Sequence, residues 1–143
     1  MRKNWVLSVL IAGGVAAGML GVTACGGATP VAPTVVTTTE TFSGSLSQGT
    51  IMVHPFVVAA QGTVVITMTA LSGPVSTIAM GMDVGTWDGT NCTSISGSAI
   101  STAKVGSVIS GTAVPSNLCA RVFDVGNIGA TDSYTYTLTV LHS

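Results

Sequence analysis

Apolar and polar residues alternate along most of the chain after residue 40. Two runs show this period of two most clearly, and both alternate large apolar residues with threonines. Their apolar positions are Val64, Ile66, Met68 and Ala70 in the first run, and Tyr134, Tyr136, Leu138 and Val140 in the second. Because successive side chains of a strand point to opposite faces, these runs predict β-strands with one buried face.

Further strands are predicted around these two runs. One of them places on a single face Ile78, Met80, Met82 and Val84. Shorter ones are expected near residues 40–46, 51–58, 99–105 and 118–125. Turn residues separate the strands at 47–49, 61–62, 72–74, 88–89, 115–117 and 126–133. About seven or eight strands with no helical period predict an all-β fold, a jelly-roll-like antiparallel β-sandwich over residues 40–143.

The first 24 residues follow a different pattern. Arg2 and Lys3 precede an apolar stretch from Trp5 to about Val22, which only Ser8 and small residues interrupt. A charged start, an apolar middle and a small-residue end are typical of a secretory signal peptide. The stretch is also close to the lower limit for spanning a bilayer core of ~30 Å, so a retained transmembrane helix is the competing interpretation.

The end of this segment, Val22-Thr23-Ala24-Cys25, resembles the bacterial lipobox. The resemblance implies a diacylglycerol thioether on Cys25, cleavage before it, and acylation of the new amino group. Two or three acyl chains hold a protein stably on a membrane. We therefore expect a lipid-anchored protein of the bacterial cell envelope, in the outer membrane if the cell is Gram-negative, because Gly26 and not an aspartate follows the cysteine. The alternative is an ordinary cysteine in a leader.

Residues 25–39 are small, β-branched or proline, and lack the large apolar groups that pack a core. This composition predicts a tether between the lipid and the folded domain. Fully extended, it spans at most ~50 Å at ~3.4 Å per residue.

The net charge of the chain after residue 24 limits the kinds of molecule that it is expected to bind. After the first 24 residues, Lys104 and Arg121 are the only basic side chains, against five acidic ones, so the net charge of this part is −3. No basic surface is expected, which argues against binding to nucleic acid.

The three cysteines fall into two groups, a single cysteine near the start of the chain and a pair in the predicted domain. Lipidation would account for Cys25, leaving Cys92 and Cys119 as a pair in an oxidising compartment. A disulfide closing about 28 residues would stabilise the fold by roughly 3.5 kcal/mol in the chain-entropy model. Two separate buried thiols are the alternative. Metal ligation is not expected, because neither cysteine belongs to a Cys-x-x-Cys unit or lies near a histidine in sequence.

Three segments resemble the bacterial pre-peptidase C-terminal domain: residues 41–46, 118–125 and 134–140. The resemblance covers roughly residues 40–143. It implies a compact jelly-roll-like sandwich that accompanies secreted peptidases without being catalytic and sometimes binds substrate or calcium. This chain departs from the pattern because the domain follows a lipid anchor and leaves no room for a peptidase.

No catalytic constellation is evident in the sequence. There is no Gly-x-Ser-x-Gly motif, His54 lies in a strand-like run before Pro55, and His142 is expected at the frayed end of the last strand. A triad needs a nucleophile, a base and an orienting acid, and two scattered histidines are more typical of strand edges. We therefore expect a protein that is not an enzyme.

Four aspartates are candidate loop ligands. Asp83 and Asp88 flank the Val-Gly-Thr-Trp segment, predicted to be a loop, and Asp124 and Asp132 flank a second loop. Such loops can supply oxygens to calcium, but no Asp-x-Asp-x-Asp-Gly run is present, and aspartates in turns usually accept hydrogen bonds from backbone N–H groups. Calcium remains the less favoured interpretation, and no other metal or cofactor is expected.

Trp87 is the one large aromatic residue in a predicted loop after the leader. An exposed indole can stack on a sugar or contact a protein partner, whereas more often such a tryptophan folds back over the end of a sandwich. Two functions follow as expectations. The domain is either a binding or structural module for a protein or glycan on the envelope, or an accessory to a peptidase made elsewhere.

Overall fold

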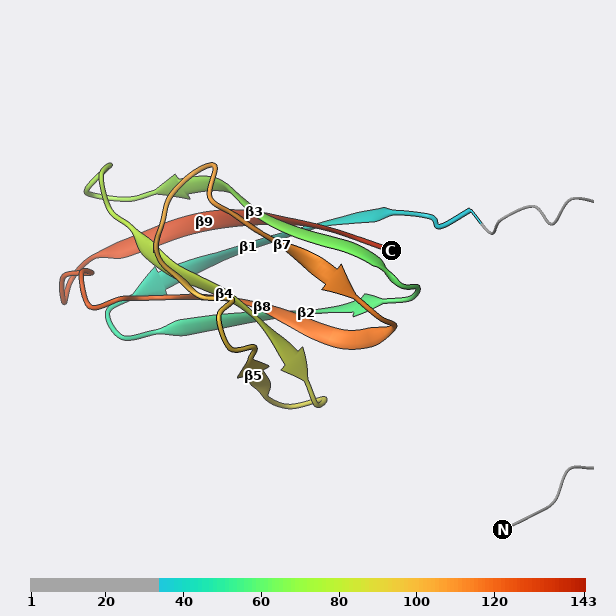
Figure 1. Ribbon diagram of the computed structural model, residues 1–143. Helices are drawn as coiled ribbons and strands as arrows, with labels where there is room; N and C mark the ends of the chain where they lie inside the picture. Colours follow the sequence, from blue (N-terminus) through green and yellow to red (C-terminus); the bar gives the residue numbers. More distant parts are fainter. Residues whose placement is uncertain (1–33) are drawn as a thin grey trace, which may run out of the picture. The chain divides into compact units, whose positions relative to one another are not determined.

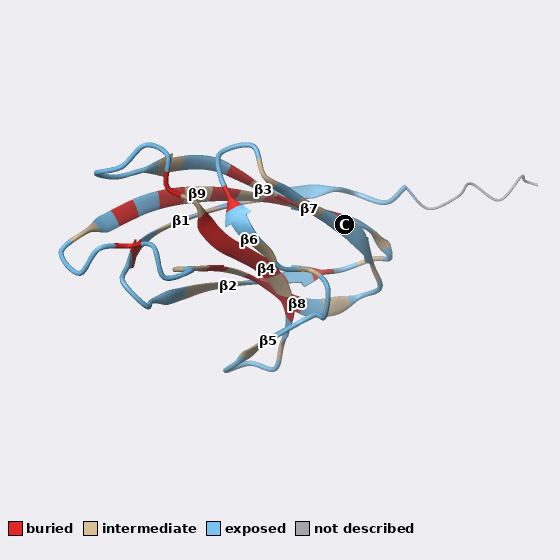
Figure 2. Cartoon of the chain, turned by 60° about the vertical axis from the view of Figure 1, so that its left-hand side comes forward, coloured by how far each residue is buried: buried red, intermediate tan, exposed pale blue. Residues whose placement is uncertain are grey.

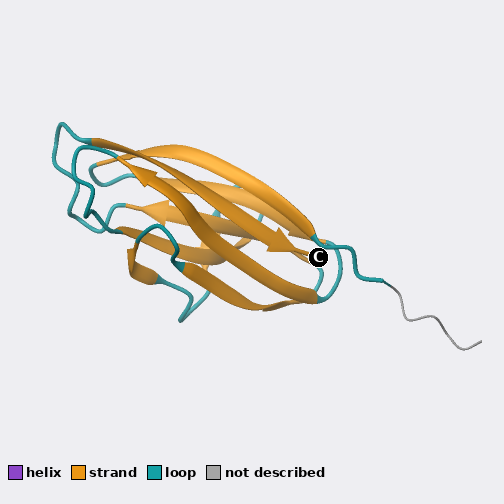
Figure 3. Ribbon diagram, turned by 90° about the horizontal axis from the view of Figure 1, so that it is seen from above, coloured by secondary structure: helices purple, strands orange, loops and turns teal. Residues whose placement is uncertain are grey.

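The computed structural model describes residues 34–143, which form nine strands and no helix (Figure 1; Figure 3). The first five strands are β1 (Thr38–Ser47), β2 (Ile51–Val58), β3 (Gly62–Ser72), β4 (Met80–Trp87) and β5 (Cys92–Ser94). The other four are β6 (Ile100–Ala103), β7 (Val108–Ala113), β8 (Ser116–Phe123) and β9 (Ser133–His142). A helix long and apolar enough to cross a membrane is not found within the described range.

The strands form two antiparallel sheets that face each other. The four-stranded sheet has the order β1-β9-β3-β7, and the five-stranded sheet has the order β2-β8-β4-β5, with β6 pairing the first part of β4. Strands β1 to β4 pass alternately between the sheets, and so do β7 to β9. This is the strand order of a jelly roll. The predicted all-β sandwich is confirmed.

The core lies between the sheets and consists largely of the inward positions that the alternation predicts, except that Ala70 is exposed because the register of β3 shifts between Met68 and Ala70. In β9, Tyr134, Tyr136, Leu138 and Val140 are all buried. In β3, Val64, Ile66 and Met68 are buried as well, and threonines occupy the outer face of both strands. Figure 2 shows buried and exposed residues alternating along β9. Residues 33–143 form a compact unit that holds both sheets and this whole core, so the unit has what an independently folding domain requires.

Three details differ from the expectations. The short strands β5 and β7 were not predicted, because β5 has only three residues and Gly111 interrupts the apolar period of β7. The turn predicted at 115–117 lies at Val114 and Pro115 instead, since β7 ends at Ala113 and β8 begins at Ser116. Strand β1 begins at Thr38, inside the segment predicted as a tether, because Thr38 and Thr39 pair with the end of β9. The predicted signal peptide, Cys25 and the other residues up to 33 lie outside the described range.

Candidate functional site

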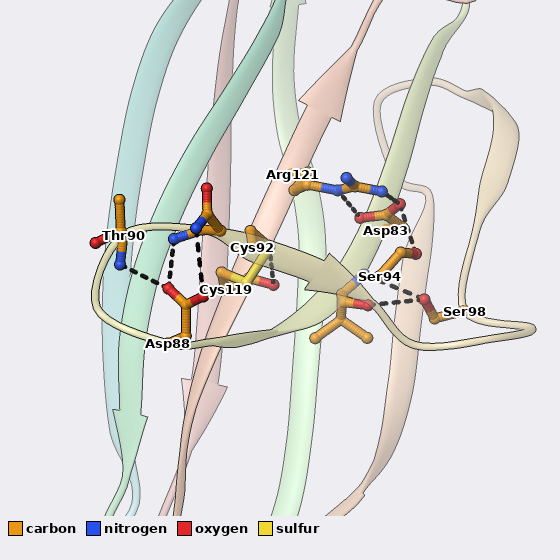
Figure 4. Close-up of a disulfide and its surroundings, with 10 residues drawn as sticks. Asp83, Asp88, Thr90, Cys92, Ser94, Ser98, Cys119 and Arg121 are labelled. Carbon is orange, nitrogen blue, oxygen red and sulfur yellow. Dashed lines mark hydrogen bonds and ion pairs between the residues drawn. A yellow bond between two sulfur atoms is a disulfide. The ribbon is translucent and has the colours of Figure 1, made fainter.

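A disulfide joins β5 to β8 on the outer face of the five-stranded sheet. Cys92 and Cys119 are bonded, with their Cα atoms 6.0 Å apart, as Figure 4 shows. Cys119 points outward because its neighbours Leu118 and Ala120 alternate with it and face the core. Cys92 pairs with Trp87 in the register of β4 and β5. The predicted disulfide is confirmed, and it fixes the end of β4 that carries the tryptophan.

A buried ion pair lies next to this disulfide. Asp83 and Arg121 face each other in the register of β4 and β8, and both carboxylate oxygens bind the guanidinium (Figure 4). The Nε–Oδ1 distance is 2.7 Å. The Ser94 hydroxyl donates to Oδ2 at 2.9 Å. The hydrogen bond from Arg121 to Asp83 is the main cause that raises the pKa of the guanidinium above its ordinary value.

The segment from Val84 to Trp87, predicted as a loop, is instead the second half of β4. It is held in the sheet because β8 pairs with it on one side and β5 on the other. Asp83 is therefore a buried strand residue whose carboxylate is occupied by Arg121 and Ser94, and not a loop ligand facing solvent.

Asp88 and Asp124 both organise turns. Asp88 Oδ1 accepts hydrogen bonds from the backbone N–H of Thr90 and Asn91, and these bonds, Asn91 first, lower the pKa of the carboxyl. Burial alone would raise the pKa of Asp124, but four backbone N–H groups together lower it below its ordinary value. Three of the four follow Asp124 in its own loop, and the fourth belongs to Gly49 in the β1–β2 turn. Asp124 thereby holds two loops together.

The structure does not bring the predicted carboxylates together. Phe123 pairs with Gly81 near the start of β4, whereas Trp87 and Asp88 lie at its end, so Asp124 and Asp88 are on the order of 20 Å apart at ~3.4 Å per residue. Within residues 34–143, no three His, Cys, Asp or Glu side chains gather in a metal-binding arrangement. The carboxylate oxygens of Asp83, Asp88 and Asp124 accept hydrogen bonds from protein donors, so these three aspartates give no basis for proposing a calcium site.

Trp87 lies beside a shallow hollow on the outer face of the five-stranded sheet. The hollow has a volume of about 590 Å³, and the side chains around the indole come from β2 and β8 and from the turn after β4. They include Pro55, Val57, Asp88 and Asn117. The indole is half-buried, so it neither folds completely over the sandwich nor projects freely. An aromatic face beside an amide and a carboxylate suits contact with sugar rings.

The two histidines have separate surroundings. His54 stacks on Phe42 with ring centroids 5.0 Å apart, and its Nε2 lies 2.7 Å from the hydroxyl of Tyr136. Burial lowers the pKa of His54 and raises that of Tyr136 to about 12, so both side chains are neutral at pH 7. Gly44 makes this contact feasible, because a Cβ there would collide with the Tyr136 ring.

His142 is not at a frayed end, contrary to the prediction. Its ring is buried, and Nε2 lies 2.8 Å from an oxygen of Glu40. The end of β9 is held because the carbonyl of Ser143 accepts hydrogen bonds from Ala59 and Ala60. In the described part of the chain, neither imidazole has a serine or threonine hydroxyl as a hydrogen-bond partner.

Sequence reasoning missed the partner of Asp83. Part of the signal was present, because the predicted strands at 78–84 and 118–125 contain residues of opposite charge, Asp83 in the first and Arg121 in the second. Opposite charges on facing strands often pair. The prediction would have required knowing that β4 and β8 are neighbours, although about 38 residues separate Asp83 from Arg121.

Comparison with models of known protein families and with curated proteins gives no match to this chain. The resemblance to the pre-peptidase C-terminal domain therefore rests on the three quoted segments and is not extended to the level of a family.

Proposed function

We propose that the chain is an exported bacterial lipoprotein, anchored through Cys25, whose jelly-roll domain is a binding module without catalytic activity. The disulfide carries this proposal. It engages the only two cysteines of the folded domain, which leaves Cys25 as the odd cysteine at the end of a signal-like segment. A disulfide in so small a domain is also typical of proteins in an oxidising compartment.

The arrangement of the domain supports a binding role. Asp83, Asp88 and Asp124 serve the fold, and the histidines contact Tyr136 and Glu40. Strand β1 also starts beside the end of β9, so the tether enters at one end of the sandwich. A lipid on Cys25 would hold such a domain at a membrane through about a dozen residues before β1, leaving its loops and faces free for partners.

The anchor is tested by changing the cysteine. We expect Cys25→Ser to abolish incorporation of a labelled fatty acid in cells and to leave an unprocessed precursor, because serine cannot form the thioether. Metabolic labelling followed by electrophoresis measures both. The matched control is the double variant Cys92→Ser/Cys119→Ser, which retains Cys25 and should still be labelled. Persistent labelling of Cys25→Ser would refute the anchor.

A second candidate function, glycan binding, is favoured by the hollow beside Trp87. Stacking of a sugar ring on the indole would be the main contact, with Asn117 as a polar neighbour. We expect Trp87→Ala to weaken binding of a soluble oligosaccharide panel, including chitin and peptidoglycan fragments, by roughly tenfold or more.

Trp87→Phe is the matched variant, because it retains an aromatic face and should retain most of the affinity. Glycan-array binding with unit 33–143, followed by calorimetry on any hit, measures the effect, and melting curves verify that both variants fold. Equal binding by the wild type and Trp87→Ala would eliminate this function. The accessory role toward a separate peptidase stays a proposal from the resemblance, and capture of a secreted peptidase by the immobilised domain would support it.

A further inference from the structure

The sandwich has one closed side and one open side. On the closed side, the turn at residues 47–50 links β1 and β2 of the two sheets. On the open side, β7 is the edge of the four-stranded sheet, and β5, β6 and the segment between them lie along the edge of the other. A cleft of about 880 Å³ lies between these edges. Pockets of this size hold small-molecule ligands in other proteins.

A missing side chain opens this cleft. Gly111 lies between Ile109 and Ala113, which pack against the core, and it is paired with the inward-facing Val64. A Cβ on Gly111 would have no atom within 4 Å. Its backbone is not in the left-handed region, so no conformational need calls for glycine here. The position that would close the core at this edge is therefore empty.

The walls of the cleft are mostly apolar and carry no charge, and their polar groups are the hydroxyls of serine and threonine residues and the backbone. The floor is formed by core residues of both sheets, including Val64, Ile66 and Leu118, and none of the lining residues carries a formal charge. Three large apolar residues are exposed around the opening: Ile95, Val108 and Val114. The Ser98 hydroxyl is already bonded to the backbone of Val84 and Ile95. Such walls favour an apolar occupant and disfavour a charged one, which would lose its hydration without gaining a partner.

We propose that this cleft binds one uncharged small molecule with an alkyl chain, of the size of a long-chain alcohol. The chain would lie between β7 and β4 over Val64 and Ile66, with Thr86 offering a hydroxyl near the opening. The complementarity is in charge and shape, because the site is a hollow between two sheets and not a flat face that a second copy would cover. This proposed ligand site does not require a lipid on Cys25.

The proposal is tested with unit 33–143 and the neutral fluorescent probe N-phenyl-1-naphthylamine. We expect saturable binding of the probe with one site per monomer. 1-Dodecanol should displace the probe. Dodecanoate at pH 8 has the same chain length but carries a charge, so displacement by dodecanoate should need a concentration at least about tenfold higher. Gly111→Leu should reduce probe affinity at least about tenfold, because its side chain would occupy the cleft. Its melting temperature should not fall, since leucine there buries apolar surface and replaces a glycine in a strand.

Thr63→Leu is the matched control, because it adds the same side chain on the outer face of β3 and should bind the probe like the wild type. Should Gly111→Leu fail to fold, methyl NMR of the wild type replaces it. Dodecanol must then shift the methyl resonances of Val64, Ile66 and Ile109 and leave the indole resonances of Trp87 unchanged. Absence of saturable probe binding, unchanged binding by folded Gly111→Leu, or shifts outside the cleft would overturn the proposal. The proposal would also be overturned if sedimentation showed that only a dimer of the domain binds the probe.

Discussion

Arg121→Met is expected to lower the free energy of unfolding by about 3–5 kcal/mol, because it leaves the buried carboxylate of Asp83 without its cation. The Asp83 side chain is only 2% exposed, so the carboxylate cannot regain water without opening the sheet. Ser94 would remain as a donor, but one hydroxyl does not replace a guanidinium that binds both oxygens.

Removing the carboxylate instead of the guanidinium should lower the free energy of unfolding by a smaller amount. The Arg121 side chain is 22% exposed, so in Asp83→Val its guanidinium can turn toward solvent, and valine suits a strand. The double variant Asp83→Val/Arg121→Met should recover much of the stability that Arg121→Met loses, because an apolar pair has no charge to leave unpaired. The coupling in this double-mutant cycle would measure the pair itself.

Urea unfolding monitored by tryptophan fluorescence gives the four free energies of the cycle. Lys104→Met is the matched control, since it removes a positive charge from an exposed side chain and should change stability by less than about 0.5 kcal/mol. A loss in Arg121→Met no larger than that in Lys104→Met would contradict the structural role of the pair.

Much of the fold was predictable from short-range pattern alone. The threonine alternation that marks β3 and β9 reflects a pleated strand with one face in the core, so the inward residues Ile66 and Leu138 were assigned correctly. The disulfide followed from the count of cysteines, once the predicted lipid anchor was assigned to Cys25 and an even pair remained. Such features depend on a few neighbouring residues or on composition.

The features that were missed depend on which strands are neighbours. Asp83 is a candidate ligand in isolation and a structural residue only once β8 places Arg121 opposite it. The same holds for the cleft, because Gly111 signals a break in a strand pattern until its pairing with Val64 shows that the missing side chain faces the core. Register between distant strands is set by the whole sandwich, and the local sequence carries little of it.

The disulfide should contribute almost as much as the ion pair. We expect Cys92→Ser/Cys119→Ser to lose about 3.5 kcal/mol, because the unfolded chain regains the freedom of a loop whose ends are 27 residues apart in sequence. In a domain of this size the loss corresponds to a fall in melting temperature of roughly 10–20 °C. Calorimetry on unit 33–143 measures it, and dithiothreitol should lower the melting temperature of the wild type to a similar value while leaving the double variant unchanged.

Removing the disulfide should also destabilise one part of the domain more than the rest. Strand β5 has three residues and pairs only with β4, so without the bond to Cys119 it depends on its pairing with residues 85–87 and on the hydrogen bond from Ser94 to Asp83. Hydrogen exchange in the double variant should therefore rise first in residues 88–95, while β3 and β9 keep their protection at the centre of the other sheet. If the Trp87 hollow binds glycans, reduction would weaken that binding below the temperature at which the domain unfolds. Uniform loss of protection in both sheets would instead mean that the disulfide stabilises the whole sandwich and has no separate effect on the tryptophan end.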